Sequence, residues 1–190
     1  MIAILDYGSG NANSVKNALN YLGENSIITS DPEKILRADR VIFPGVGAFG
    51  DAMKELKKRN LDGAIKKFIG SKKPFLGICI GLQVLFEKSE ENPNIKGLGI
   101  FNGKVVRFKQ GKVPQIGWNK IISRSIGNGY AYFVNSYYAV PNDKKIIEST
   151  SDYYVEFTAA IKKDNVFATQ FHLEKSGKFG LEILRKWLEC

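Results

Sequence analysis

The stretch KPFLGICIGLQVLF (residues 73–86) joins a short apolar run to a glycine-flanked cysteine and then to a second apolar segment. Short apolar runs that are bounded by proline or glycine are typical of buried strands. We therefore expect a strand that ends just before Cys79 and a helix that begins at about Gly81. In this arrangement the thiol stands at a sharp turn between a strand and a helix.

The sequence before this stretch alternates apolar runs with amphipathic segments. A helix is expected from an N-cap at Asn13 or Ser14, and another from Asp31, which precedes a proline at the first helical position. Two basic amphipathic helices precede residue 73. This alternation is the pattern of βα units around a parallel sheet. The expected strands are residues 2–5, 26–30 and 40–43.

After about residue 95 the chain is rich in β-branched and aromatic residues, which favour strands. The longest such segment, YAYFVNSYYAV (130–140), is expected to be one strand, and most of these strands should be antiparallel. A helix with an apolar face ends the chain. No linker is evident, so residues 1–190 are expected to form one α/β domain with a mostly parallel central sheet, flanking helices and an antiparallel β extension.

The composition excludes several classes of protein. The chain has 190 residues, 44% hydrophobic and 25% charged, with only two cysteines and no stretch of 18 apolar residues. A cytoplasmic protein is therefore expected, with neither a signal peptide nor a membrane span. The net charge of +9 is spread along the chain, which argues against nucleic-acid binding. It leaves open solvated helix faces or attraction to a phosphorylated substrate or acidic partner.

The Gly-x-Cys-x-Gly turn around Cys79 resembles a nucleophile elbow, in which small flanking residues allow a strained turn that exposes one side chain. A thiol near a helix N-terminus is favoured as thiolate, and free N–H groups there can stabilise an oxyanion. The alternative interpretation is structural, because free cysteine is among the most buried residue types. On this motif alone both interpretations stay open.

His172 is the only histidine, so a metal site built from several histidines is excluded and any imidazole base must be this residue. It is expected at the end of a strand. Residues i and i+2 of a strand share a face, so Glu174 can orient the imidazole ring. A cysteine on an elbow with a downstream His-x-Glu supplies a nucleophile, a base and an orienting group.

Two glycine-rich loops have different interpretations. PGVGAFG (44–50) leaves a strand that should lie near the strand of Cys79, and its glycines could let a backbone N–H point at a ligand. An ordinary βα turn is the simpler alternative. GSGNAN (8–13) lacks the third glycine and the ribose-binding acid of a dinucleotide site, so that function is not expected.

Ordered motifs along nearly the whole chain resemble those of the class I, triad-type glutamine amidotransferases. Within that family the similarity is greatest to the glutaminase subunits of imidazole glycerol phosphate synthase. The resemblance implies a flavodoxin-like fold that hydrolyses glutamine to glutamate and ammonia without a metal or organic cofactor. The motifs include DYGSGN (6–11), PGVGAFGDAM (44–53), KPFLGICIGLQVLF (73–86) and QFHLEKSGKFGLEIL (170–184).

The resemblance also implies roles for single residues. Cys79 would attack the carboxamide carbon, His172 would relay protons, and Glu174 would orient His172. The implied oxyanion donors are the backbone N–H groups of Val46 and Ile80. The residues implied to hold glutamine are Gly47, Gln83, Glu91, Ser136 and Tyr137.

In the family, the ammonia passes to a (β/α)8 barrel cyclase, which forms imidazole glycerol phosphate in histidine biosynthesis. The resemblance therefore implies a heterodimer whose glutaminase activity stays low until the barrel binds its ligand. Asn11, Gln115 and Trp118 match regions that face this partner.

Three positions depart from the usual pattern of the histidine-pathway members. Gln115 and Asn135 stand where histidine is usual, and Leu173 stands where proline is usual. None is a triad position, so the departures bear on the acceptor of the ammonia. They support an alternative, a paralogous glutaminase that feeds another synthase, such as one amidinating a surface-polysaccharide sugar. A non-catalytic regulatory subunit and a cysteine protease are more distant alternatives.

Overall fold

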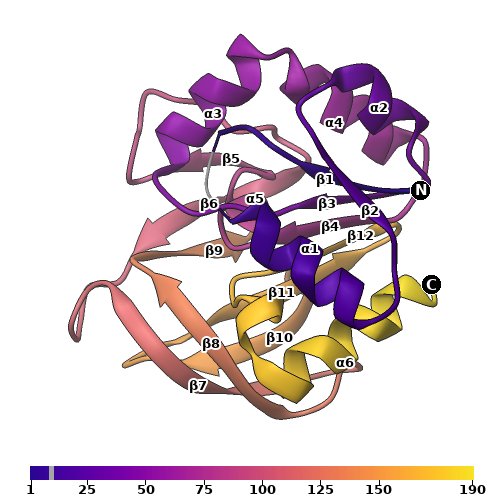
Figure 1. The fold of residues 1–190 in the computed structure, drawn as a ribbon. Coiled ribbons are helices and arrows are strands. Elements are labelled where there is room, and N and C mark those ends of the chain that lie inside the picture. Colours follow the sequence, from indigo (N-terminus) through magenta and orange to yellow (C-terminus); the bar gives the residue numbers. More distant parts are fainter. Residues whose placement is uncertain (9–10) are drawn as a thin grey trace.

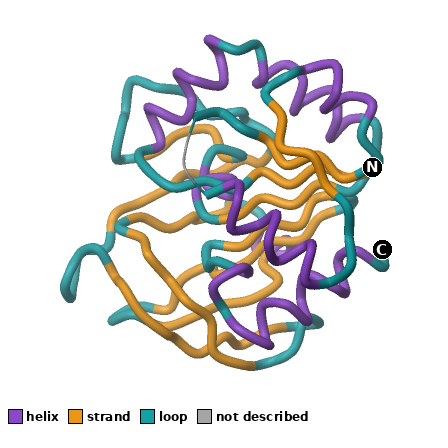
Figure 2. Tube along the Cα trace, in the orientation of Figure 1, coloured by secondary structure: helices purple, strands orange, loops and turns teal. Residues whose placement is uncertain are grey.

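The computed structural model describes residues 1–8 and 11–190, so Ser9 and Gly10 of the DYGSGN motif lie outside the described residues. The chain folds into a large central sheet with helices on both faces (Figure 1). Figure 2 shows the strands crossing the middle of the molecule between two groups of helices. Within the described part, the main sheet has nine strands in the order β2-β1-β3-β4-β12-β11-β10-β7-β8.

One half of this sheet is parallel and the other half is antiparallel. The parallel strands are β1 (Ile2–Leu5), β2 (Ser26–Thr29), β3 (Arg40–Phe43), β4 (Phe75–Ile78) and β12 (Val166–Thr169). The antiparallel strands are β7 (Gln115–Ser123), β8 (Gly129–Asn135), β10 (Ile147–Asp152) and β11 (Glu156–Lys163). The predicted α/β class, with a parallel centre and an antiparallel extension, is confirmed.

A second sheet of three strands lies beside the first. It consists of β5 (Phe86–Ser89), β6 (Phe101–Arg107) and β9 (Tyr137–Pro141). The prediction of one strand over residues 130–140 is wrong, because the chain leaves the main sheet after β8 and enters the second sheet at β9. The polar pair Asn135-Ser136 is the one interruption of the apolar and aromatic residues here, and a two-residue interruption does not show from the sequence that the chain changes sheets.

The helices divide between the two faces of the main sheet, and both faces of its parallel half are therefore buried. Helices α2–α4 share one apolar cluster with Ala3 and Leu5 of β1, whereas α1 and α6 share the other with Ile2 and Ile4. Strands buried on both faces are typical of parallel α/β sheets. The helices are α1 (Ala12–Tyr21), α2 (Pro32–Arg37), α3 (Phe49–Lys58), α4 (Leu61–Gly70), α5 (Ile80–Gln83) and α6 (Gly177–Leu188), with 3₁₀ turns η1 (Lys144–Ile146) and η2 (Leu173–Lys175).

Two predicted helix starts have different outcomes. The Asp31 N-cap of α2 is confirmed, since its carboxylate accepts a 2.9 Å hydrogen bond from the Glu33 N–H. Helix α1 begins earlier than predicted, with Asn11 rather than Asn13 or Ser14 at the N-cap position. The Asn11 side chain makes no capping bond, and its Nδ2 donates to Glu174.

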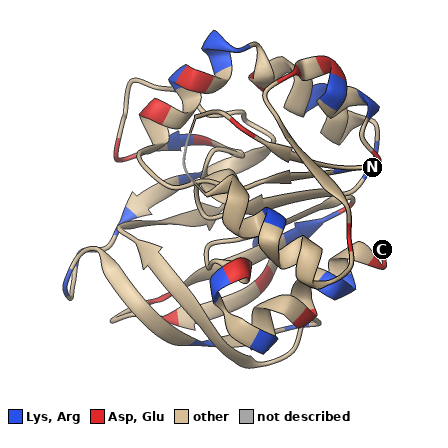
Figure 3. Cartoon of the chain, in the orientation of Figure 1, with Lys and Arg blue, Asp and Glu red and all other residues tan. Residues whose placement is uncertain are grey.

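Basic residues are distributed over the helices and strands, with acidic residues among them, as Figure 3 shows. No described helix is both long enough and apolar enough to cross a membrane.

Candidate active site

Cys79 occupies a strained turn between β4 and α5. Its φ of 55° and ψ of −105° lie in a region that residues other than glycine rarely adopt. The flanking glycines are needed for close packing. A Cβ on Gly77 would lie 2.6 Å from the Gly81 carbonyl oxygen, and a Cβ on Gly81 would lie 2.0 Å from that of Phe43. This geometry matches the predicted nucleophile elbow.

Helix α5 begins at Ile80, one residue before the predicted start at about Gly81. It has only four residues, so the contribution of a helix macrodipole at Cys79 is small. Ile80 is its first residue, however, and the N–H of a first helical residue has no partner within the helix. The turn therefore provides a hydrogen-bond donor beside the thiol rather than the field of a long helix.

The strain at Cys79 can be measured through stability. We expect Cys79→Gly to be more stable than Cys79→Ala, with a free energy of unfolding about 1 kcal/mol higher, because alanine keeps the Cβ that makes this conformation unfavourable. Both variants lack the thiol, so their difference isolates the backbone term. Urea denaturation of the two proteins measures it. Equal stabilities would show that the turn carries no strain.

His172 and Glu174 form a buried pair. Their side chains are 0% and 1% exposed, and Nδ1 of His172 lies 2.8 Å from Oε1 of Glu174. The predicted contact is present, but its predicted origin in a strand is wrong. Strand β12 ends at Thr169, and Glu174 lies in the 3₁₀ turn η2, for which His172 is the N-cap. A tight turn, rather than alternation along a strand, brings the carboxylate to the ring.

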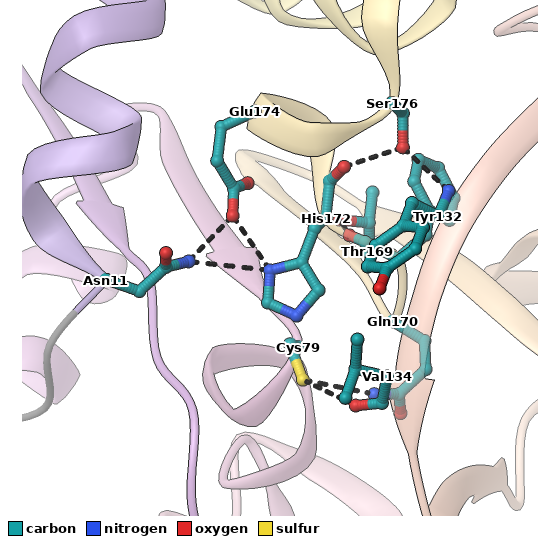
Figure 4. Close-up of polar contacts among 10 residues, drawn as sticks. Asn11, Cys79, Tyr132, Val134, Thr169, Gln170, His172, Glu174 and Ser176 are labelled. Carbon is teal, nitrogen blue, oxygen red and sulfur yellow. Dashed lines mark hydrogen bonds and ion pairs between the residues drawn. The ribbon is translucent and has the colours of Figure 1, made fainter. Parts of the chain in front are cut away.

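The other ring nitrogen faces the thiol. Figure 4 shows Nε2 of His172 pointing toward Cys79, while Nδ1 points toward Glu174. Nε2 is buried and has no hydrogen-bond partner in the described part of the chain. Burial disfavours the protonated ring, but the Cys79 sulfur and the Glu174 carboxylate outweigh it and raise the pKa of His172 from 6.5 to about 10. The ring is thus poised to hold a proton between the two groups.

The pKa of Glu174 shifts in the opposite direction, downward. Burial favours its neutral form, but the hydrogen bond and charge of His172, together with the Asn11 amide, lower the pKa of Glu174 below 4.5. Asn11 donates from Nδ2 to Oε1 of Glu174 at 2.6 Å and is only 5% exposed. The carboxylate is therefore held by two neighbours and remains charged at neutral pH.

The pair predicts a pH-dependent stability. The pKa of His172 is higher in the folded chain, so its stabilising effect is fully present below about pH 6.5 and is lost as the pH rises toward 10. We expect the difference in unfolding free energy between wild type and His172→Gln to shrink over this interval. Urea denaturation at several pH values measures it. A difference that is constant from pH 6 to pH 10 would contradict this assignment.

One cavity collects the other predicted residues. It has a volume of about 190 Å³, and Cys79 lies in its wall. Ser136 and Tyr137 reach it because the chain changes sheets there. All eight predicted nucleophile, oxyanion and substrate positions line it, together with Pro114, Val134 and Asn135; the eight are Val46, Gly47, Cys79, Ile80, Gln83, Glu91, Ser136 and Tyr137.

Two of these residues also have structural partners. Glu91 accepts a 2.7 Å hydrogen bond from the Phe49 N–H, so its carboxylate caps the start of α3. The Val46 carbonyl accepts a 3.2 Å hydrogen bond from the Tyr7 hydroxyl. The loop that carries Val46 and Gly47 is therefore fastened at one point to the segment that follows β1.

The three predicted interface residues lie in different environments. Trp118 is 53% exposed, whereas Asn11 and Gln115 are 5% and 1% exposed. The Asn11 amide bonds to Glu174, and the Gln115 amide donates to Oδ1 of Asn135 at 3.4 Å. The two departures from histidine, Gln115 and Asn135, are thus directly opposed residues of β7 and β8.

Gln170 is a site residue that was not predicted from the sequence. It is fully buried, and its Nε2 lies 3.6 Å from the Cys79 sulfur (Figure 4). A signal was available, since Gln170 is two positions before His172 and extended segments place such residues on one side. Among residues 1–8 and 11–190, no group of three His, Cys, Asp or Glu side chains is arranged to hold a metal.

Comparison with known proteins agrees with this site. The chain is 48% identical over 197 residues to imidazole glycerol phosphate synthase subunit HisH of Methanothermobacter thermautotrophicus, covering 100% of this chain and 98% of that protein. It is 45% identical over 201 residues to subunit HisH 1 of Methanococcus maripaludis, covering 100% and 99%. A solved glutamine amidotransferase structure superposes with a TM-score of 0.82 at 18% identity, covering 99% of this chain and 97% of that one, which shows a shared fold.

The family model for "Glutamine amidotransferase class-I" matches residues 3–189, which is nearly the whole chain. The sequence motifs, the elbow and the arrangement of the two sheets are consistent with this match. The chain belongs to the class I glutamine amidotransferase family.

Proposed function

We propose that this chain is the glutaminase subunit of an imidazole glycerol phosphate synthase, which hydrolyses glutamine and delivers ammonia to a barrel cyclase. The observation that carries the proposal is the position of Cys79, which has the cavity on one side and the His172–Glu174 pair on the other. Similarity over the full length to two HisH subunits supports the choice of pathway. A reducing cytoplasm suits a nucleophile that must remain a free thiol.

The proposed reaction has two halves. The Cys79 sulfur attacks the carboxamide carbon, the C–N bond breaks, and His172 gives a proton to the departing ammonia. This leaves a glutamyl thioester. A water molecule then loses a proton to His172 and attacks the thioester carbon, which releases glutamate and restores the thiol. Glu174 keeps Nδ1 of His172 engaged, so Nε2 is the nitrogen that exchanges protons with the sulfur side.

The backbone is proposed to stabilise the oxyanion in both halves. The Ile80 N–H follows the nucleophile directly and supplies one donor, and the Val46 N–H in the PGVG loop supplies the second. Donors of this kind act on the charge that develops in the transition state.

The cavity residues are proposed to hold the amino-acid end of glutamine. Gln83 donates from Nε2 to the Tyr137 carbonyl and to Oε1 of Gln170, both at 3.0 Å, so both of its N–H groups are in use. The group that remains for the substrate is its carbonyl oxygen, which can accept from an ammonium or carboxamide N–H. Glu91 carries negative charge toward the same space, which suits the α-ammonium group.

The partner surface is proposed to include Trp118 and its neighbours on β7. Ile116, Trp118 and Ile122 lie on one face of the strand, with Lys120 between the last two, and are 63%, 53% and 57% exposed. Exposed apolar side chains that cluster on one face are typical of protein interfaces. This face lies on the outer part of the main sheet, at β7 and β8 (Figure 1).

The test is co-purification with a (β/α)8 barrel cyclase and measurement of glutamate release, with and without its phosphorylated aminoimidazole ribonucleotide ligand. We expect the nucleotide to raise the rate at least tenfold and imidazole glycerol phosphate to form. Failure of the nucleotide to stimulate a Cys79-dependent hydrolysis would reject the pathway.

A second candidate is a paralogous glutaminase that supplies another synthase, such as one amidinating a polysaccharide sugar. The observation in its favour is that both usual histidines are replaced and that their replacements, Gln115 and Asn135, bond to each other beside the cavity. Substituting both with histidine separates the candidates. Improved coupling to the nucleotide in the double variant would favour this second function, and a loss of coupling would favour the first.

A further inference from the structure

Four buried side-chain amides lead from the antiparallel half of the main sheet to the Cys79 sulfur. We call them the amide chain: Gln115, Asn135, Gln83 and Gln170, which are 1%, 5%, 5% and 0% exposed. Buried amides need hydrogen-bond partners, and each amide has a donor end and an acceptor end. The direction of each amide is therefore set by its neighbours.

One backbone carbonyl fixes the direction of the arm that reaches the sulfur. The Tyr137 carbonyl can only accept, so the Gln83 amide must turn its nitrogen toward it, at 3.0 Å. The second N–H on that nitrogen meets Gln170 at 3.0 Å, so the Gln170 oxygen must face Gln83. The Gln170 nitrogen then has to lie on the opposite side, 3.6 Å from the sulfur of Cys79.

The same Tyr137 carbonyl also orients the other arm, which consists of Asn135 and Gln115. Asn135 also donates from Nδ2 to the Tyr137 carbonyl at 3.0 Å, so its oxygen faces Gln115 and accepts from Nε2 at 3.4 Å. Reversing Gln83 or Asn135 would place an oxygen against the Tyr137 carbonyl oxygen. The orientations of Gln83, Gln170 and Asn135 are therefore fixed together, whereas Gln115 is bonded only through Nε2 and its buried Oε1 has no partner among the described residues.

We propose that Gln170 holds an N–H donor against the Cys79 sulfur and stabilises its thiolate from the side opposite to Glu174, with Gln83 positioning Gln170. The proposal rests on the proposed function, since it concerns the same nucleophile. An N–H donor to a charged acceptor is worth more than one to a neutral acceptor, so it favours the thiolate over the thiol. The alternative partner of the sulfur is the Val134 carbonyl, 4.0 Å away, which can bond only to the protonated thiol.

The orientation gives the substitutions distinct outcomes. Gln170→Met removes the donor and keeps a side chain of similar length and flexibility. Gln170→Glu keeps an acceptor for Gln83 but turns a carboxylate oxygen toward the sulfur, which opposes the thiolate. A residue needed only for packing would tolerate both changes about equally.

The experiment measures thiol reactivity without glutamine or a partner. The full chain is treated with iodoacetamide at one neutral pH, and mass spectrometry gives the rates at Cys79 and at exposed Cys190, which is an internal reference in every variant. Because Cys190 is far from the site, its alkylation rate should be the same in wild type and in every variant. For Gln170→Met we expect the Cys79/Cys190 ratio to fall about tenfold to a hundredfold, and for Gln170→Glu to fall further.

Gln83→Met keeps Gln170 but removes the side chain that orients it, so we expect a smaller fall in the Cys79/Cys190 ratio than for Gln170→Met. The double variant Gln83→Met/Gln170→Met should have the same ratio as Gln170→Met alone, because the donor is already absent there. Circular dichroism and urea midpoints establish that each variant is folded. If the Gln170 variants do not fold, the Cys79/Cys190 ratio of Gln83→Met tests the proposal. A ratio unchanged from wild type in a folded Gln170→Met or Gln83→Met would overturn the proposal. Failure of the wild type in complex with the barrel cyclase and its nucleotide ligand to hydrolyse glutamine would instead reject the proposed function, because alkylation does not depend on it.

Discussion

Replacing Cys79 with alanine is expected to lower glutamate release in the complex with the barrel synthase by about 10⁴-fold or more. Removing a nucleophile from a triad costs on the order of 10⁴- to 10⁶-fold, because the remaining groups have no covalent route to offer. His172 and Glu174 are not expected to substitute, since His172 carries protons in the proposed reaction and Glu174 is buried behind it, with its side chain 1% exposed. The measurement is the rate of glutamate formation at saturating glutamine.

The matched control for this variant is Cys190→Ala. Cys190 is exposed at the C-terminus, and its thiol contacts only the Lys186 carbonyl, at 3.2 Å, among the described hydrogen bonds. We expect its removal to leave the rate unchanged. A Cys79→Ala complex that retained even a tenth of the wild-type rate would mean that the thiol is not the nucleophile.

Replacing Gly81 with alanine is expected to lower the free energy of unfolding by roughly 3 kcal/mol or more. The added Cβ would lie 2.0 Å from the Phe43 carbonyl oxygen, which belongs to the backbone of β3 and has no freedom to rotate away. Overpacking a rigid interior costs typically 1–3 kcal/mol and more when backbone must move. Relief would require α5 to shift, and with it Cys79 and the Ile80 N–H, so glutaminase activity should fall as well.

Gly63→Ala is the control for Gly81→Ala. Gly63 is an exposed residue of α4, and no other group lies within 4 Å of the point that an alanine Cβ would occupy there. Alanine is favoured over glycine inside a helix by about 0.5–1 kcal/mol, so this variant should be more stable than wild type. Urea denaturation of both variants measures the contrast. A Gly81→Ala protein as stable as Gly63→Ala would show that the elbow does not depend on the close packing of α5 against β3.

The parallel half of the fold and the strained turn that carries Cys79 could be predicted from local patterns. The strands at 40–43 and 75–78 are short, mostly apolar runs with a proline beside each, Pro44 and Pro74, which marks them independently of the rest of the chain. The elbow needs only a small residue two positions before and two positions after Cys79, and Gly77 and Gly81 are both visible in the local sequence. The eight cavity positions followed from motifs shared with a family.

Other features depend on contacts between distant segments. The break at Ser136 separates β8 from β9 because each pairs with strands of a different sheet, and the polar pair Asn135-Ser136 does not show this from the sequence. The Asn11 side chain could cap α1 or bond to Glu174, and only the folded chain brings that carboxylate within 2.6 Å. The amide chain joins Gln83 to Gln170, 87 residues away, and no local rule pairs two glutamines.

The most direct test of the central claim is covalent labelling of the free chain and of the complex with a chloroketone analogue of glutamine. Its electrophilic carbon takes the place of the carboxamide carbon, so a nucleophile in a glutamine site should capture it. We expect one label per chain, located on Cys79 by peptide mass spectrometry, with labelling slowed by glutamine and Cys190 unmodified. Labelling of Cys190 at the same rate, or labelling of Cys79 that glutamine does not slow, would contradict the assignment of this cavity as a glutaminase site.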